Sequence, residues 1–126
     1  MNTQFFQAIS TTEFTCMKNN GHSFFIGRVF RSNGAVDTQG IQNIKNAKSA
    51  GISHVDGYIF PCTTSSCAAP ATQISEASKA LKNAGATVGM LWLDIETYNW
   101  PSDHTKNREF IEAMGKELTV SYSLKK

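Results

Sequence analysis

Short apolar runs recur along the chain about every 30 residues, and this repeat restricts the fold more than any other feature of the sequence. Each run is rich in aromatic and β-branched residues, as β-strands are. The runs that predict strands lie at residues 24–30, 55–60 and 88–95, with a further candidate at 118–124 and a weaker first strand at 3–8. The spacing is the length of one strand–helix unit, so it predicts parallel strands joined by helices.

Helical patterns fill the gaps between these runs. Ser10 and Glu13 have the spacing of a capping box, which begins a helix with Phe14 and Met17 on its apolar face. Asp37 is placed to cap a second helix. In the later helices apolar residues recur every three or four positions: Ile41, Ile44, Ala47 and Ala50; Ile74, Ala77, Leu81 and Ala84; and Phe110, Ile111, Met114 and Leu118.

Two α/β architectures fit this alternation, an open doubly wound sheet and part of a (β/α) barrel. A complete barrel needs at least ~200 residues, and this shorter chain has room for about four strand–helix units and a fifth strand. We therefore expect one domain over residues 1–126. No glycine-rich dinucleotide or P-loop motif follows any of the expected strands, which argues against those two functions.

The charge balance excludes two classes of partner. The chain has 12 Lys and Arg against 10 Asp and Glu, and its formal net charge of +2 is too small to indicate binding to nucleic acid or a membrane surface. No apolar run approaches the ~18–20 residues of a membrane span. His22, His54 and His104 lack the spacing of metal ligands, so we expect no metal and no cofactor.

The three cysteines are an odd number, so at least one thiol has no partner within the chain. Cys62 and Cys67 flank a short polar loop that a disulfide could close, with Cys16 left over; the alternative is three reduced thiols. The first residues have no basic region and no 7–15-residue apolar stretch, so we expect no signal peptide here.

The carboxyl ends of parallel strands are where α/β proteins place their chemistry. Asp94 and Glu96 stand at the end of the run at 88–95, two positions apart, so on a strand they point to one side with Cα atoms roughly 6.5–7 Å apart. Two carboxyls that face one cleft raise each other's pKa. An acid beside a carboxylate is what a glycosidase uses. The alternative is a strand that simply ends in polar residues.

Other strand residues point toward the same region. Asp56 shares its side with Tyr58 and Phe60, and it either takes part in the site or is an interior polar residue held by a neighbour. Arg28, inside an apolar strand, is expected to pair with one of the three carboxylates. Flat rings that suit sugar stacking surround the acidic pair: Tyr58, Trp92, Tyr98 and Trp100.

Five stretches of the chain, in order, resemble the glycoside hydrolase family 25 lysozymes (the Chalaropsis-type muramidases), most of all the branch found in protists and invertebrates. They lie at residues 14–24, 28–34, 43–52, 55–62 and 89–96, and the last, Gly-Met-Leu-Trp-Leu-Asp-Ile-Glu, is the most specific. The resemblance implies a modified TIM-like (β/α) barrel, here incomplete at its C-terminal side. It also implies cleavage of the β-1,4 bond between N-acetylmuramic acid and N-acetylglucosamine in bacterial peptidoglycan, in antibacterial defence or bacterial digestion.

The resemblance implies a role for four of the candidate residues. Glu96 matches the family's general acid, and Asp94 matches the carboxylate beside it, which stabilises the cation or orients the 2-acetamido group. Asp56 matches an aspartate at a strand end, and Tyr58 matches an aromatic of the sugar cleft. The predicted catalytic residues are thus Glu96, Asp94 and Asp56, and the predicted substrate-binding residues are Tyr58, Trp92, Tyr98 and Arg28.

The chain also departs from the family pattern. Gln4 stands where family members carry a first-strand aspartate, and the family domain continues past a fifth strand. A catalytically inactive homologue or a glycan-binding remnant is therefore the alternative to a working muramidase. The sheet edge after 118–124 would be uncovered, which predicts self-association. Family members are typically secreted or lysosomal or phagosomal, and this sequence does not itself specify a compartment.

Overall fold

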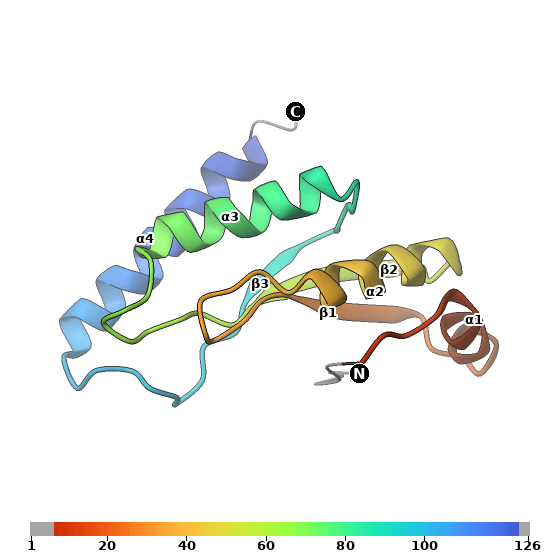
Figure 1. The fold of residues 1–126 in the computed structure, drawn as a ribbon, viewed down its shortest axis with the longest axis horizontal. Coiled ribbons are helices and arrows are strands. Elements are labelled where there is room, and N and C mark those ends of the chain that lie inside the picture. The colour runs from red at the N-terminus through yellow and green to blue at the C-terminus, as the bar shows by residue number, and fades with distance from the viewer. Residues whose placement is uncertain (1–6, 124–126) are drawn as a thin grey trace.

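The computed structural model describes residues 7–123 and shows a three-stranded parallel sheet with four helices (Figure 1). The strands are β1 (Phe24–Phe30), β2 (His54–Ile59) and β3 (Leu91–Leu93), and they lie side by side in chain order. The helices are α1 (Thr11–Asn19), α2 (Thr38–Ser49), α3 (Pro70–Asn83) and α4 (His104–Ser123). The predicted alternation of parallel strands with helices is confirmed.

The local signals that begin the first two helices act as predicted. The Glu13 amide donates to Ser10 Oγ at 3.1 Å and the Ser10 amide donates to Glu13 Oε2 at 2.7 Å, which completes the capping box of α1. Asp37 Oδ1 accepts the Gly40 amide at 2.9 Å and so caps α2. The turn after α2 requires a left-handed residue, and Gly51 supplies it with φ of 80°.

One face of the sheet is buried beneath α2 and α3. Alternate strand residues make this face because side chains along a strand point to opposite sides. A Cβ at Gly27 would lie 2.6 Å from Ile44 Cγ1, so α2 approaches β1 as closely as a glycine allows. The buried cluster consists of Phe25, Val29, Val55, Ile59 and Leu91 from the sheet, with Ile41, Ile44 and Ala47 from α2 and Ile74, Ala77 and Leu81 from α3.

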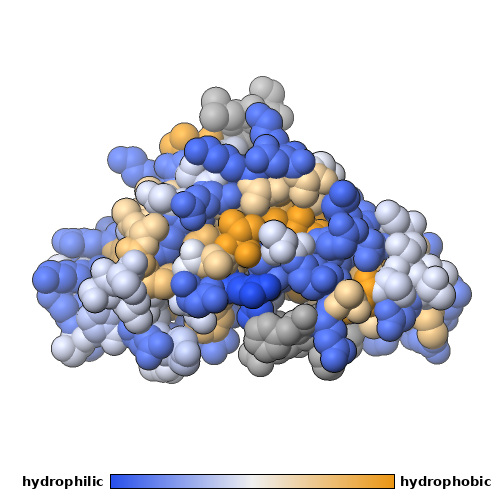
Figure 2. Space-filling model, in the orientation of Figure 1, coloured by the Kyte–Doolittle hydropathy of each residue, from blue (hydrophilic) through white to orange (hydrophobic). Residues whose placement is uncertain are grey.

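Helix α4 lies along α3, on the upper side of the molecule in Figure 1. Its Met114 is fully buried and joins the same core. Between α3 and α2, Figure 2 shows an apolar area bordered by hydrophilic side chains. Large apolar side chains that are about half exposed lie in β3 or next to it, among them Met90, Trp92 and Ile95.

The prediction of a strand at 118–124 is wrong over the residues that the structure describes, because 118–123 form the last turns of α4. Phe110, Ile111, Met114 and Leu118 keep the three- and four-residue spacing of one helical face, and this face packs against the core. An uncovered sheet edge after residue 118 therefore does not exist in this part of the chain. The predicted self-association would have to use another edge.

The weaker first strand falls largely outside the described residues, which begin at residue 7; residues 7 and 8 are in no strand. The expected first-strand position Gln4 also lies outside them. The described residues thus form three strands rather than the five of the sequence prediction. The α/β class is confirmed, and closure into a barrel remains a prediction.

The third strand is shorter than the predicted run at 88–95, yet its hydrogen bonds extend beyond Leu91–Leu93 on both sides. The Gly89 amide donates to the Val55 carbonyl at 2.9 Å, before the strand. The Asp94 amide donates to the Ile59 carbonyl at 3.0 Å, after it. Asp94 is therefore held at the carboxyl edge of the sheet by its own backbone.

Candidate active site

Arg28, Tyr58 and Trp92 form a row across the three strands, on the face opposite the buried cluster. Arg28 pairs with Tyr58 in the β1–β2 register, and Tyr58 pairs with Trp92 in the β2–β3 register. Partners in register point to the same side of a parallel sheet. Three of the residues predicted to bind substrate are thus brought together, although they are far apart in sequence.

Asp94 and Glu96 follow β3 and lie close enough to influence each other's protonation. Burial raises the pKa of Asp94, and the negative charge of Glu96 and a hydrogen bond between the two carboxyls raise that pKa further. Asp94 is half-buried at the strand end, whereas Glu96 is exposed. The predicted acidic pair therefore exists as a pair, and its more buried member holds its proton to higher pH.

Tyr58 lies within electrostatic range of this pair. Its side chain is buried, with 7% of its surface exposed, and burial is the main reason that the pKa of its phenol is raised. The positive charge of Arg28 acts to lower this pKa, while the negative charges of Asp94, Asp37 and Glu96 raise it. The phenol thus lies within electrostatic range of one guanidinium and three carboxylates, and it retains its proton at neutral pH.

Asp56 uses both of its carboxylate oxygens to hold the third strand. The Met90 amide donates to its Oδ1 and the Trp92 indole Nε1 donates to its Oδ2, both at 2.9 Å. Trp92 keeps 47% of its surface exposed in this position. The sequence left two interpretations open for Asp56, and its contacts are those of a polar residue held by its neighbours. One of these neighbours, Trp92, is a ring of the predicted sugar cleft.

Arg28 forms an ion pair with Asp37, the residue that caps α2. Its Nε lies 2.7 Å from Asp37 Oδ2, and Nη2 of Arg31 lies 3.2 Å from Asp37 Oδ1. Burial acts to raise the pKa of Asp37, but the Gly40 amide and the two guanidiniums outweigh it, so this pKa is lowered. Sequence reasoning assigned Asp37 to helix capping alone and expected Arg28 to pair with Asp56, Asp94 or Glu96.

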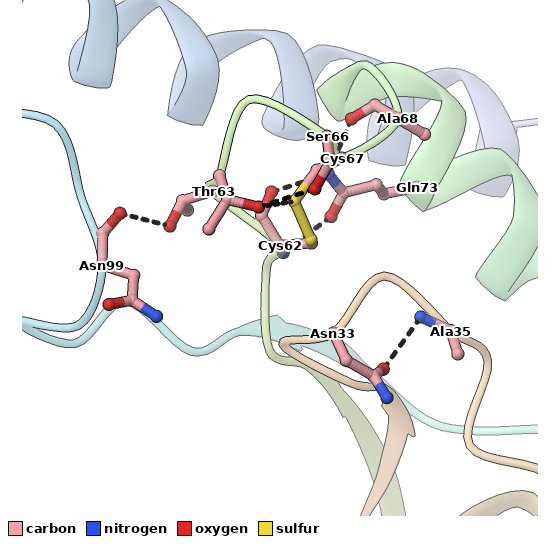
Figure 3. Close-up of a disulfide and its surroundings, with 10 residues drawn as sticks. Asn33, Ala35, Cys62, Thr63, Ser66, Cys67, Ala68, Gln73 and Asn99 are labelled. Atoms are coloured by element: carbon pink, nitrogen blue, oxygen red, sulfur yellow. Dashed lines mark hydrogen bonds between the residues drawn. A yellow bond between two sulfur atoms is a disulfide. The ribbon is translucent and has the colours of Figure 1, made fainter.

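The segment after Glu96 runs between two cavities. Glu96, Trp100 and His104 line one of about 540 Å³ at the start of α4. Tyr98 and Asn99 line the other, of about 410 Å³, on the side of the Cys62–Cys67 loop (Figure 3). The structure therefore separates Tyr98 from the cavity that holds Glu96, although both belong to one predicted site.

Each aromatic ring of this segment is held edge-on by a phenylalanine. The Tyr98 ring centroid lies 5.6 Å from that of Phe60 at 84°, and the Trp100 centroid lies 5.4 Å from that of Phe110 at 85°. Tyr98 is 51% exposed even so. These contacts fix the rings in place while leaving one of them open to solvent.

The loop after β2 is closed by a disulfide between Cys62 and Cys67, whose Cα atoms are 5.7 Å apart. Of the two alternatives left open by the sequence, the structure shows the disulfide, with Cys16 as an exposed free thiol on α1. Gln73 also holds this loop from inside α3. The sequence signal for Gln73 was its position on the apolar face of that helix, one residue before Ile74.

Within residues 7–123, no group of three or more His, Cys, Asp or Glu side chains is arranged to hold a metal ion. In the same range, no helix combines the length and the apolar character that crossing a membrane requires.

The acidic pair at the end of a parallel α/β sheet, with exposed aromatic rings nearby, is compatible with the two-carboxyl chemistry of glycosidases. Comparison with known proteins agrees. The family model described as "Lysozyme-like protein 1" matches residues 1–123, and the chain belongs to this lysozyme-like family. The resemblance to glycoside hydrolase family 25 lysozymes is confirmed.

The curated relatives carry names of the same kind. The chain is 56% identical over 109 residues to "Lysozyme-like protein 5" of Caenorhabditis elegans, covering 86% of this chain and 51% of that protein. It is 42% identical over 106 residues to "Probable GH family 25 lysozyme 2" of Dictyostelium discoideum, covering 83% and 49%. The chain thus spans about half the length of these relatives. No solved structure gives a significant match.

Proposed function

We propose that this chain provides the acidic pair and sugar cleft of a lysozyme-like glycoside hydrolase that cleaves the β-1,4 bond between N-acetylmuramic acid and N-acetylglucosamine in bacterial peptidoglycan. The biological role would be antibacterial defence or digestion of bacteria. The observation that carries the proposal is the pair of neighbouring carboxyls, Asp94 and Glu96, at the carboxyl edge of β3, with Glu96 exposed in a cavity that Trp100 also lines.

Glu96 is the residue we assign as general acid. It is exposed and lines a cavity with Trp100, so the oxygen of a glycosidic bond can reach it. Protonation of that oxygen lets the bond break, and the sugar ring develops positive charge. Asp94, held at the strand end, then stabilises that charge or orients the acetamido group.

The raised pKa of Asp94 gives this assignment a pH signature. Stabilising a cation requires the ionised form of Asp94, and a raised pKa moves ionisation to higher pH. Asp94 must therefore lose its proton before it can stabilise the cation. We expect Asp94→Asn to change the pH dependence of the rate, because this variant has no carboxyl to titrate at that position.

The aromatic residues of the same face supply the binding surface. Trp92 is half exposed and its indole is fixed by Asp56, so the ring is oriented before any sugar arrives. Parallel strands joined by helices that pack on one face of the sheet are also how a (β/α) barrel is built, and such a barrel is the fold that the family resemblance implies. In such a barrel the row Arg28, Tyr58 and Trp92 would face the interior.

The test is clearing of a turbid peptidoglycan suspension by the purified chain beside two variants. Glu96→Gln removes the acid, and we expect it to lower the clearing rate by at least ~100-fold. Glu76→Gln, an exposed position on α3, changes the same charge away from the site and should clear like the wild type. A folded wild type that does not clear, or a Glu96→Gln variant that still does, would overturn the proposal.

Glycan binding without turnover is the second candidate. The contacts of Asp56 favour it, because both carboxylate oxygens accept hydrogen bonds from Met90 and Trp92, so this residue orients a ring of the predicted sugar cleft. A pull-down on the same peptidoglycan separates the two candidates. Retention of a folded wild type that clears nothing would support binding alone, whereas absence of both retention and clearing would exclude both candidates.

A further inference from the structure

A polar cavity of about 410 Å³ lies beside the disulfide, whose surroundings Figure 3 shows, and it shares no lining residue with the cavity of Glu96. Three segments build it: the loop after β1, the disulfide loop after β2, and the segment after the acidic pair. The lining side chains that matter here are Asn33, Thr64, Ser66, Ala68, Tyr98 and Asn99. Its volume falls within the ~300–1,000 Å³ of small-molecule sites.

The wall formed by the disulfide loop is held on two sides. The Cys62–Cys67 bond closes the loop, and Gln73, fully buried in α3, clamps it from within. Gln73 Oε1 accepts the Cys62 amide at 2.9 Å, and its Nε2 donates to the carbonyls of Cys62 at 2.9 Å and Ala68 at 2.8 Å. A wall restrained in this way is preformed, which reduces the entropy lost on binding.

The cavity is also tied to the acidic pair. Thr63 Oγ1 donates to the Asn99 carbonyl at 2.9 Å, joining the disulfide loop to the segment after β3. Asn99 has a φ of 54°, which turns the chain sharply at this contact. The Tyr98 amide donates to the Glu96 carbonyl at 2.8 Å. Ligand held in the cavity would therefore lie next to the segment that positions the proposed general acid.

The lining chemistry selects a neutral ligand. No charged side chain lines the cavity; its polar groups are hydroxyls and amides, and its one aromatic ring, Tyr98, is 51% exposed. Hydroxyl and amide groups beside an open ring match a sugar, which has hydroxyls at its edge and an apolar face. The stem peptides of peptidoglycan carry charges that would lose water here without a partner.

We propose that this cavity is a saccharide subsite that binds a neutral hexosamine unit of the glycan strand, without its peptide stem. The proposal deepens the proposed function and rests on it, since the glycan is the same. The disulfide loop then sets how one end of the glycan lies relative to Glu96.

The test measures calorimetric binding of chitotetraose, a neutral oligomer of N-acetylglucosamine, to the Glu96→Gln chain, which cannot turn it over. Ala68 and Ala69 are adjacent exposed alanines, and only Ala68 lines the cavity. Ala68→Phe fills the cavity while leaving the Gln73 clamp intact, because that contact uses the Ala68 backbone. We expect Ala68→Phe to weaken binding at least ~10-fold and Ala69→Phe to change it less than ~2-fold.

A second variant and a competitor sharpen the result. Tyr98→Ala should weaken binding by about 10-fold through loss of the ring face. An acidic stem-type tripeptide at the same concentration should not compete. Absent binding, binding unaffected by Ala68→Phe in a chain with unchanged circular dichroism, or competition by the peptide would each overturn the subsite.

Failure of the subsite and failure of the proposed function give different results. If the wild type clears peptidoglycan through Glu96 but chitotetraose binding is insensitive to Ala68→Phe, the function stands and the subsite is overturned. If binding is sensitive to Ala68→Phe but the wild type clears nothing, the subsite stands as a binding site and catalysis is overturned.

Discussion

The two faces of this sheet are made by the same three strands, yet they are stabilised in different ways. On the helix-covered face, Val29 and Ile59 have no exposed surface and pack beneath α2 and α3. On the other face, Arg28 and Asp56 are half-buried and Trp92 is 47% exposed. Alternate residues of one strand thus contribute to a close-packed core and to a polar site.

Hydrogen bonds and ion pairs stabilise the site face, whereas close packing of apolar side chains stabilises the covered face. Asp56 bonds the indole of Trp92, and Arg28 pairs with Asp37, which ties β1 to the start of α2. Packing is sensitive to size, whereas hydrogen bonds and ion pairs are sensitive to charge and pH. Substitutions on the two faces should therefore differ in kind as well as in magnitude.

The largest effect is expected at the helix–strand contact of the covered side. A Cβ at Gly40 would overlap the carbonyl oxygen of Arg28, whereas a Cβ at Gly115 in α4 meets nothing within 4 Å. We expect Gly40→Ala to lower the free energy of unfolding by about 4 kcal/mol or to prevent folding. Gly115→Ala should raise it by about 0.5–1 kcal/mol. Urea unfolding followed by circular dichroism measures both, and changes of the same sign would contradict this prediction.

The next comparison takes one residue from each face. Ile44→Ala leaves a cavity under the sheet and should cost about 3 kcal/mol of unfolding free energy, with glycan binding by the folded chain retained. Trp92→Ala should cost about 1 kcal/mol, because the ring is half exposed and loses one hydrogen bond, but it should abolish binding. Stability and peptidoglycan retention are measured on the same preparations. If the two variants changed the free energy of unfolding and the peptidoglycan retention equally, the proposed difference between the faces would be wrong.

Removing the ion pair between Arg28 and Asp37 should lower the free energy of unfolding by an amount that depends on pH. Asp37→Asn removes the charge that pairs with Arg28 and Arg31, and we expect a loss of about 2 kcal/mol at pH 7. The pKa of Asp37 is lowered in the folded state, so its contribution is present above the ordinary aspartate pKa. It is lost as pH falls through the lowered value. Unfolding curves from pH 7 to pH 2 should converge for wild type and variant, and a constant offset would count against the ion pair.

The contribution of Asp94 to stability should depend on pH in the opposite direction to that of Asp37. Its pKa is raised, so the folded state binds this proton more tightly and stability falls as pH rises through the raised value. Asp94→Asn lacks this penalty and should be more stable at pH 7 by less than about 1 kcal/mol, because the carboxyl is partly exposed and solvent screens it. The gain should vanish near pH 3. A variant that is less stable than wild type at pH 7 would show that the pair stabilises the fold.

The smallest effect concerns association between copies of the chain. Within the described residues β1 and β3 each pair with β2 alone among the strands, so both are edge strands, and the outer edge of β3 is the one at which the predicted self-association is tested. We expect size-exclusion elution to shift earlier as concentration rises, and a charged substitution at the exposed Met90 to reduce the shift. A single monomer peak at every concentration would exclude association through this edge.

The sequence by itself determined the local elements of this protein. Capping residues, left-handed glycines and three- or four-residue apolar spacing act over a few positions, so Ser10, Asp37 and the face of α2 could be predicted without knowing the fold. The proximity of Asp94 and Glu96 was predictable for the same reason, since the two residues are only two positions apart, directly after β3. The strand prediction for 118–124 is wrong over residues 118–123, because their sequence suits either period and Met114 and Leu118 pack against the core on one face of α4.

Only the tertiary structure decided the contacts between distant segments. The partner of Arg28, the two bonds of Asp56 and the clamp of Gln73 on the disulfide loop each depend on how strands register and how a helix crosses them. Several carboxylates were available to Arg28, and no local rule ranks them. Arg28 pairs with Asp37 because the chain that leaves β1 turns back into α2, which brings Asp37 Oδ2 within 2.7 Å of Arg28 Nε.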